Sequence, residues 1–252
     1  MSSEEGDVIT VLDGRVKLGQ PAQKSFRTSM DSIFLAAAVP DNLQGDILDL
    51  GCGVGSAGLS VIWRVPGCSL TGVDNQPEFV EIAEKNAERN DMKDKCIFVC
   101  ADVSDYCKTL HNKQYDCVIT NPPYFESGKY MSSPYALKNG ALGHQSGDKN
   151  DGLYTWIMSA HYALRQKGLL CLIHRADHLD KILQALGPRF GATEIFPLHP
   201  RSDEAASRVL IRSVKGRKSP VKLYPGLVLH DLDGADTQIA TDILRNGKPL
   251  GY

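Results

Sequence analysis

The chain has 252 residues, 42% of them hydrophobic and 23% charged, which is ordinary for a globular protein. Its formal net charge of −2 at pH 7 excludes a strongly basic field over the whole molecule, so any contact with nucleic acid requires a local patch. There is no run of about 18 apolar residues, and the acidic, polar start MSSEEGDVIT is unlike a signal peptide. The sequence therefore indicates a cytoplasmic protein without a membrane span.

Short apolar segments alternate with helical patterns along the chain. Continuously apolar segments are typical of strands that are covered on both faces, and alternation of strands with helices predicts a parallel, doubly wound α/β sheet. Two later segments, 192–198 and 206–214, have no helix of usual length between them and are predicted to pair as an antiparallel hairpin at one edge. One domain spanning 1–252, with a mostly parallel seven-stranded sheet, is expected. The other predicted strands are 46–50, 69–74, 96–102, 115–120 and 168–174, and the predicted helices are 33–39, 56–65, 76–90 and 151–166.

The cysteines and histidines do not predict a metal site. Seven cysteines, an odd number, include no C-x-x-C pair, which favours buried free thiols over a disulfide framework or a zinc site. His174 and His178 are four residues apart, as in helical metal pairs, but no Glu or Cys completes a plausible ligand set. We therefore expect no metal. The cysteines are Cys52, Cys68, Cys96, Cys100, Cys107, Cys117 and Cys171.

A glycine-rich turn follows the first predicted strand, in the sequence LDLGCGVGSAGLS. Gly51, Gly53 and Gly55 would let the backbone approach a ligand closely and adopt positive φ angles. The dinucleotide pattern G-x-G-x-x-G would require glycine where Ser56 stands. The preceding Asp49 favours a ligand that carries a cation, such as S-adenosylmethionine with its ammonium and sulfonium groups. The alternative is a tight strand-to-helix turn without a ligand.

Acidic residues also follow the second and third predicted strands. Because ligands of open α/β sheets bind beyond the carboxyl ends of the strands, Asp74 is predicted to accept both ribose hydroxyls of the cofactor. Asp102 is predicted to accept a hydrogen bond from its adenine amino group. Each aspartate could instead cap the helix that follows it. The neighbouring Asn75 and Val103 are included in the predicted cofactor site.

The fourth predicted strand ends in Asn121-Pro122-Pro123-Tyr124. The prolines have no N–H to continue the sheet and form a stiff corner. The carbonyls of Asn121 and Pro122 could accept both hydrogens of a planar NH₂ group while the Tyr124 ring stacks on its face. The nitrogen lone pair could then face the methyl donor without a strong base. These four residues are the predicted catalytic residues, with Asn121 also bordering the cofactor; the alternative is a proline turn with a packed tyrosine.

These motifs, in this order, resemble the class I S-adenosylmethionine-dependent methyltransferases that modify amino groups. The motifs are LDLGCGVGSAGL, VDNQPEFVEIAEKN, AD and NPPYF. The segments 26–40 and 168–220, followed by LYPGLVLHD, are similar to the bacterial tRNA valine adenine-N6 methyltransferase family, over roughly residues 8 to 250. The resemblance implies a Rossmann-like fold and methylation of N6 of the adenine just 3′ of the anticodon. Ser25 departs from the glycine that many members have there.

The resemblance also implies that the extension 1–45 borders the cofactor pocket, with Phe26 and Arg27 lining the substrate side. Alternatively, Ser29 or Asp31 simply caps the helix over 33–39.

Three segments are predicted to contact a tRNA substrate. The segment 201–222 carries seven Lys or Arg against two acids, which favours contact with phosphate over a solvated charged face. The polar, glycine-rich segment 132–151 is predicted to be a mobile substrate loop. Tyr124 and Phe125 would stack on an unpaired base, although Phe125 could equally be a core residue. The predicted substrate-binding residues are Tyr124, Phe125, Lys129, Arg212, Lys215, Arg217 and Lys218.

Other functions remain open from the sequence alone. The same chemistry could act on guanine N2 in rRNA, on DNA adenine or on a protein glutamine amide. The glycine pattern and the Asn-Pro-Pro-Tyr corner disfavour a nicotinamide-dependent oxidoreductase, and a non-catalytic cofactor-binding module is a further alternative. The sequence leaves the oligomeric state undefined and favours a monomer only slightly.

Overall fold

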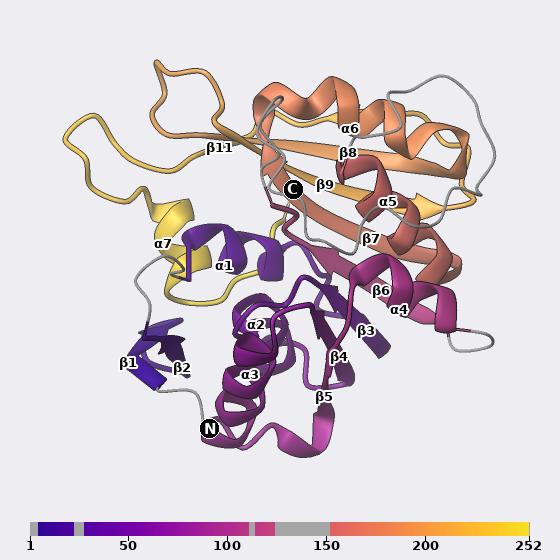
Figure 1. Ribbon diagram of the computed structural model, residues 1–252. Helices are drawn as coiled ribbons and strands as arrows, with labels where there is room; N and C mark the ends of the chain where they lie inside the picture. The colour runs from indigo at the N-terminus through magenta and orange to yellow at the C-terminus, as the bar shows by residue number, and fades with distance from the viewer. Residues whose placement is uncertain (1–4, 23–27, 111–113, 124–151, 252) are drawn as a thin grey trace.

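The computed structural model describes residues 5–22, 28–110, 114–123 and 152–251, and its centre is a twisted mixed sheet (Figure 1). Within these residues the sheet has nine strands in the order β10-β8-β9-β7-β6-β3-β4-β5, with β11 also paired to β8. Only β9 runs antiparallel to its neighbours, β7 and β8. The strands are β3 (Gly45–Leu50), β4 (Cys68–Asp74), β5 (Cys96–Cys100), β6 (Tyr115–Thr120), β7 (Leu164–Arg175), β8 (Phe190–His199), β9 (Arg208–Lys215), β10 (Lys222–Leu223) and β11 (Leu227–Val228).

Helices cover both faces of the sheet because the strands alternate between two apolar cores. In β3, Ile47 belongs to one buried cluster and Leu48 to the other, as expected for a period of two residues. The first cluster is completed by α1 (Met30–Ala37), α2 (Ser56–Arg64), α3 (Pro77–Arg89) and α7 (Gln238–Leu244). The second is completed by α4 (Val103–Thr109), α5 (Gly152–Ala163) and α6 (Leu179–Leu186). Short 3₁₀ turns lie at Lys93–Lys95, Ala176–His178 and Gly187–Arg189.

A separate antiparallel hairpin precedes this sheet and was not predicted. Its strands are β1 (Glu5–Val11) and β2 (Val16–Pro21), which pair only with each other among the described strands. Val16 and Leu18 are fully buried and join the first core cluster. The hairpin therefore packs against the helical layer rather than extending the main sheet, as its position beside α2 and α3 in Figure 1 also shows.

The predicted doubly wound, mostly parallel sheet is confirmed, with differences at its ends. The segments 192–198 and 206–214 do pair antiparallel, but β9 lies between β7 and β8, and the two-residue strands β10 and β11 extend the sheet beyond β8. The helix predicted over 151–166 ends at Ala163, because the chain enters β7 at Leu164. All seven cysteines are free thiols, and only Cys100 is exposed. Within the described ranges, no helix is long and apolar enough to cross a membrane.

Candidate active site

The carboxyl ends of four neighbouring parallel strands meet at one edge of the sheet. Leu50, the last residue of β3, pairs with Thr120 on one side and with Val73 on the other. Gly51 therefore lies between Asn121 and Asp74, the residues that follow those two partners. Thr120 strengthens this junction by donating its hydroxyl to the Leu50 carbonyl at 3.0 Å. The motifs after three different strands are brought together here, as the sequence predicted.

The turn after β3 has the backbone geometry for which glycine is required. Gly51, Gly53 and Gly55 have φ angles of +70°, +52° and +85°, in the left-handed region that side chains disfavour. The Gly51 N–H donates to the Val73 carbonyl at 2.8 Å, which fixes the turn to the end of β4. The turn leads directly into α2, so the N-terminus of this helix lies at the same edge.

Two buried carboxylates lie under this turn. Asp49 is 2% exposed, and its Oδ2 accepts the Gly58 N–H at 3.1 Å. Burial, with a smaller contribution from the nearby Asp74 carboxylate, raises the pKa of Asp49 to about 7. Asp74 accepts the Gly53 N–H at 2.9 Å and the Gln76 N–H at 3.0 Å, and burial raises its pKa as well. A cationic ligand bound above the glycines would favour the ionised form of both carboxyl groups.

Asp102 caps the N-terminus of α4, which was the alternative interpretation of this residue. Its Oδ1 accepts the N–H groups of Ser104 at 2.8 Å and Asp105 at 3.2 Å, at the start of α4. Capping engages this oxygen and does not itself prevent a ligand from binding at Oδ2. Val103 beside it is buried, whereas Asn75 after β4 is exposed.

The proline corner follows β6 directly. Asn121 is half-buried, Pro122 is buried and Pro123 is exposed. Asn121 is therefore the first residue after β6, one position beyond the Leu50–Thr120 pair. The remaining predicted residues of this corner and its loop, which are Tyr124, Phe125, Lys129 and the segment 132–151, lie outside the described residues.

The N-terminal segment borders the glycine turn through a chain of polar contacts. The Thr28 hydroxyl lies 2.7 Å from the Ser56 hydroxyl at the start of α2, and Gln20 Nε2 donates to Thr28 at 3.0 Å. Ser29 occupies the N-cap position of α1 without a side-chain capping bond, and Asp31 instead accepts Arg208 Nε at 3.1 Å. Phe26 and Arg27 lie outside the described residues.

Two residues at this edge are not among the predicted site residues. Asn86 of α3 is fully buried; it accepts the Gly19 N–H at 2.7 Å and donates to the carbonyls of Gly19 at 3.1 Å and Val54 at 2.9 Å. Trp156 of α5 contacts Gly51. An asparagine in the middle of an amphipathic helix was the only sequence signal for the first, and the second lies far along the chain.

The predicted phosphate-binding residues lie away from this edge. Because β9 is antiparallel, Arg208 pairs with Arg175 at the carboxyl end of β7, and Lys215 lies at the opposite end. Lys215 donates to the carbonyls of His161 and Leu164, both at 2.6 Å. Arg212 forms an ion pair with Glu194 at 2.8 Å and lies over the ring of Phe196.

Arg217 and Lys218, which follow β9, are exposed at the same distant edge of the sheet. The geometry thus gives Arg212 and Lys215 intramolecular partners and does not bring these four residues to the glycine turn. Their predicted contact with substrate stays a prediction.

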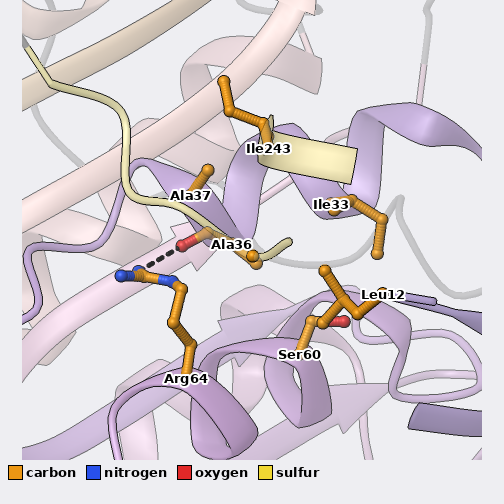
Figure 2. Close-up of a pocket in the computed structure, with 8 residues that line it drawn as sticks. Leu12, Ile33, Ala36, Ala37, Ser60, Arg64 and Ile243 are labelled. Carbon is orange, nitrogen blue, oxygen red and sulfur yellow. Dashed lines mark hydrogen bonds between the residues drawn. The ribbon is translucent and has the colours of Figure 1, made fainter. Parts of the chain in front are cut away.

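A small cavity and a stacked histidine pair include none of the predicted site residues. The cavity in Figure 2, of about 10 Å³, lies between α1, α2 and α7 and is crossed by Arg64, which donates to the Ala36 carbonyl at 2.8 Å. It can hold at most about one water molecule. The rings of His174 and His178 stack 5.0 Å apart, and no cluster of three metal-ligating side chains occurs in the part of the chain that the structure describes.

The residues at the glycine turn fit S-adenosylmethionine. The glycines present a surface without side chains, and the buried carboxylates Asp49 and Asp74 match a ligand with positive ammonium and sulfonium groups. The pattern lacks the third glycine of the dinucleotide fingerprint, where Ser56 is buried instead.

Comparisons with known proteins agree with a methyltransferase fold. Residues 27–138 match the family model described as the methyltransferase small domain. The chain is 26% identical over 203 residues to a tRNA1(Val) (adenine(37)-N6)-methyltransferase of Yersinia enterocolitica, covering 71% of this chain and 80% of the relative. A protein of the same name from Porphyromonas gingivalis is 27% identical over 164 residues, 63% of this chain and 62% of that relative. The solved structure of a predicted O-methyltransferase from Agrobacterium tumefaciens superposes with a TM-score of 0.70 at 28% identity, covering 88% of this chain and 98% of the other.

The sheet order, the glycine turn and these likenesses define an S-adenosylmethionine-dependent methyltransferase with the class I, Rossmann-like fold. More particularly, the chain is an N-methyltransferase, and the resemblance to the bacterial tRNA valine adenine-N6 methyltransferases is confirmed.

Proposed function

We propose that the protein transfers a methyl group from S-adenosylmethionine to N6 of an adenine in tRNA, in the anticodon loop of a valine tRNA. The observation that carries this proposal is that Asn121 and Gly51 each follow one member of the Leu50–Thr120 pair, at the neighbouring ends of β6 and β3. An amide carbonyl at that point can hold an exocyclic amino group against the methyl donor. The two relatives whose names contain this activity support the choice of substrate. A tRNA substrate also implies a cytoplasmic location.

The chain's own groups act by positioning and electrostatics. When bound, S-adenosylmethionine supplies a methyl group on a positively charged sulfur. Asn121 Oδ1 and the Pro122 carbonyl accept the two amino hydrogens, which directs the nitrogen lone pair towards the methyl group. Asp74 orients the ribose, Asn75 and Val103 border the cofactor, and Asp102 meets the adenine amino group through the oxygen that the helix cap leaves available.

Aromatic stacking completes the proposed site. Tyr124 and Phe125, which follow the described corner, stack on the flipped base, and Lys129 contacts the nucleic acid near it. An anticodon-loop base is unpaired, so its extrusion requires less free energy than opening a duplex.

The test is methyl transfer from labelled cofactor to total tRNA and, in parallel reactions, to rRNA and to protein, with the labelled tRNA species isolated before nucleoside analysis. Label in N6-methyladenosine of valine tRNA supports the proposal. Label in another base or in another tRNA contradicts the substrate assignment, and label on a protein glutamine or on rRNA guanine favours the alternative targets that share this chemistry. Absence of transfer with intact cofactor binding favours a non-catalytic module.

The mechanism predicts a specific defect at Asn121. Asn121→Ala should reduce the rate of methyl transfer by about 10²- to 10³-fold, because one of the fixed acceptors is lost, while cofactor affinity stays within about threefold of wild type. The matched control is Asn42→Ala, an exposed asparagine before β3 at the opposite edge of the sheet. Unchanged transfer by Asn121→Ala would remove the proposed mechanism.

A further inference from the structure

Trp156 occupies the space where a side chain of Gly51 would lie. A Cβ atom built on Gly51 would be 2.5 Å from Trp156 Cη2 and 2.9 Å from Cζ3, both far inside van der Waals contact. Gly51 also has a φ angle of +70°. The six-membered ring of the indole therefore lies directly against the first residue of the glycine turn and closes one side of it.

The packing of Trp156 fixes the indole in this position. The residue is half-buried on α5 and packs against the second core cluster, which also contains Leu50 and Val103. Leu50, the last residue of β3, immediately precedes the glycine turn, and Val103 is the first residue of α4, immediately after Asp102. One aromatic side chain thus joins the same apolar cluster as residues that adjoin two of the loops that form the cofactor site. Neither loop could move far without disturbing it, because packed cores transmit displacement.

We propose that Trp156 is a positioning residue for S-adenosylmethionine. Its indole holds the Gly51 turn in the left-handed conformation and forms part of the wall beside the bound cofactor. The role concerns cofactor binding and does not depend on which substrate accepts the methyl group. If the tRNA assignment failed, this inference would still stand. If Trp156 had no role in cofactor binding, the tRNA assignment would be unaffected.

The chain offers an internal control, because it contains only one other tryptophan. Trp63 lies near the end of α2, with the Arg15 guanidinium 5.7 Å from its ring centre and Gly247 against its edge. These neighbours belong to the hairpin turn and to the segment after α7, not to the loops at the carboxyl ends of the strands. Emission from the two indoles can be separated by replacing each with phenylalanine.

The first experiment is a fluorescence titration with S-adenosylhomocysteine, with saturation verified by calorimetry. The Trp63→Phe protein, in which Trp156 is the sole indole, should show a saturable change in emission with the calorimetric dissociation constant. The Trp156→Phe protein, in which only Trp63 emits, should show none. Emission from Trp156 that stays constant at saturating ligand would overturn the proposal.

The second experiment measures affinity in folded variants. Trp156→Ala should weaken S-adenosylhomocysteine binding by about tenfold, which corresponds to about 1.4 kcal/mol, whereas Trp156→Phe should keep it within about threefold by retaining an aromatic ring. The KM for S-adenosylmethionine should rise with little change in kcat. A purely structural role predicts lower thermal stability with unchanged affinity, and that result would contradict the inference. If Trp156→Ala does not fold, the titration of the Trp63→Phe protein decides.

Discussion

Asp74 accepts a hydrogen bond from the Gly53 N–H at 2.9 Å, so the carboxylate at the end of β4 holds the glycine turn that follows β3. Its other oxygen accepts the Gln76 N–H at 3.0 Å, at the entrance to α3. The residue predicted to bind the cofactor ribose is therefore also a structural link between two loops. The cofactor role and the capping role are not alternatives, because carboxylate oxygens can each accept more than one hydrogen bond.

Replacement of Asp74 should therefore weaken cofactor binding in a graded manner. Asp74→Ala should raise the dissociation constant for S-adenosylhomocysteine by about 30-fold or more, because it removes the ribose acceptor and releases the turn. Asp74→Asn should have a smaller effect, because the amide oxygen can still accept the Gly53 N–H. Calorimetry measures both, with Asp180→Ala, an exposed aspartate in the first turn of α6, as the control. Equal affinities for wild type and Asp74→Ala would refute the role.

Asn86 should be important for stability rather than for chemistry. Its side chain is fully buried and connects α3 to β2 and to the carbonyl of Val54 in the glycine turn. Asn86→Ala should lower the free energy of unfolding by about 2–4 kcal/mol, because buried partner groups at Gly19 and Val54 lose their hydrogen bonds. Denaturant titration gives the value, and the surface change Asn42→Ala should stay within about 0.5 kcal/mol of wild type. A loss below about 1 kcal/mol would show that the three contacts are dispensable.

The basic residues after β9 can be tested separately for structure and for substrate binding. Lys215→Ala should reduce stability by about 1 kcal/mol, because the ammonium bonds two carbonyls at the end of α5, and should leave tRNA affinity unchanged. The exposed pair Arg217 and Lys218 lies at the edge of the sheet opposite the glycine turn. If they contact phosphate as predicted, charge reversal at both should weaken tRNA binding by more than about tenfold at fixed salt and reduce its salt dependence. A change of less than about threefold would exclude this pair as a phosphate contact.

Because of Asp49, the free energy of unfolding should fall as pH rises, whereas a paired surface carboxylate makes it rise with pH. Its pKa is raised to about 7 by burial, so between about pH 4 and pH 7 the native state holds a proton that the unfolded state has lost. Its contribution to stability is therefore lost as pH rises through that range. His161 and His174, whose pKa values burial lowers to about 4, act in the opposite direction below about pH 6.5.

The comparison of wild type with Asp49→Asn cancels the histidine contributions. The amide can still accept the Gly58 N–H but does not ionise. The stability of Asp49→Asn relative to wild type should increase by about 2–3 kcal/mol between pH 5 and pH 8, measured by denaturant titration without cofactor. A difference that does not vary with pH would mean that Asp49 does not titrate in this range.

Sequence patterns predicted backbone features well where these depend on local residue type. Glycines at φ angles of +52° to +85° and an asparagine before two prolines are readable from residue type, because no other residues suit those backbones as well. The strand ends also follow from short apolar runs. The N-terminal hairpin was missed because polar residues and glycine interrupt the apolar pattern of its strands, EGDVITV and VKLGQP. The strand β9 was placed at an edge because adjacency in the chain does not reveal insertion between two other strands.

The partners of cationic side chains in the segment 201–222 could not be predicted from the sequence either. Charge alone favours solvent or phosphate for Arg212 and Lys215, yet each has found an acceptor on a different element. Partner choice of this kind depends on which side chains the sheet brings within about 3 Å of one another.

The amino-acid sequence by itself determined the doubly wound sheet, the left-handed glycine turn and the rigid corner at Asn121, because each follows from hydrophobic period or from the restricted backbone of glycine and proline. Tertiary structure alone decided that Gly51 lies between Asn121 and Asp74, that Trp156 lies against Gly51, and that Asn86 ties the turn to the hairpin. These contacts join residues 23 to 105 positions apart in the chain, and only the packing of both cores against one sheet brings them together.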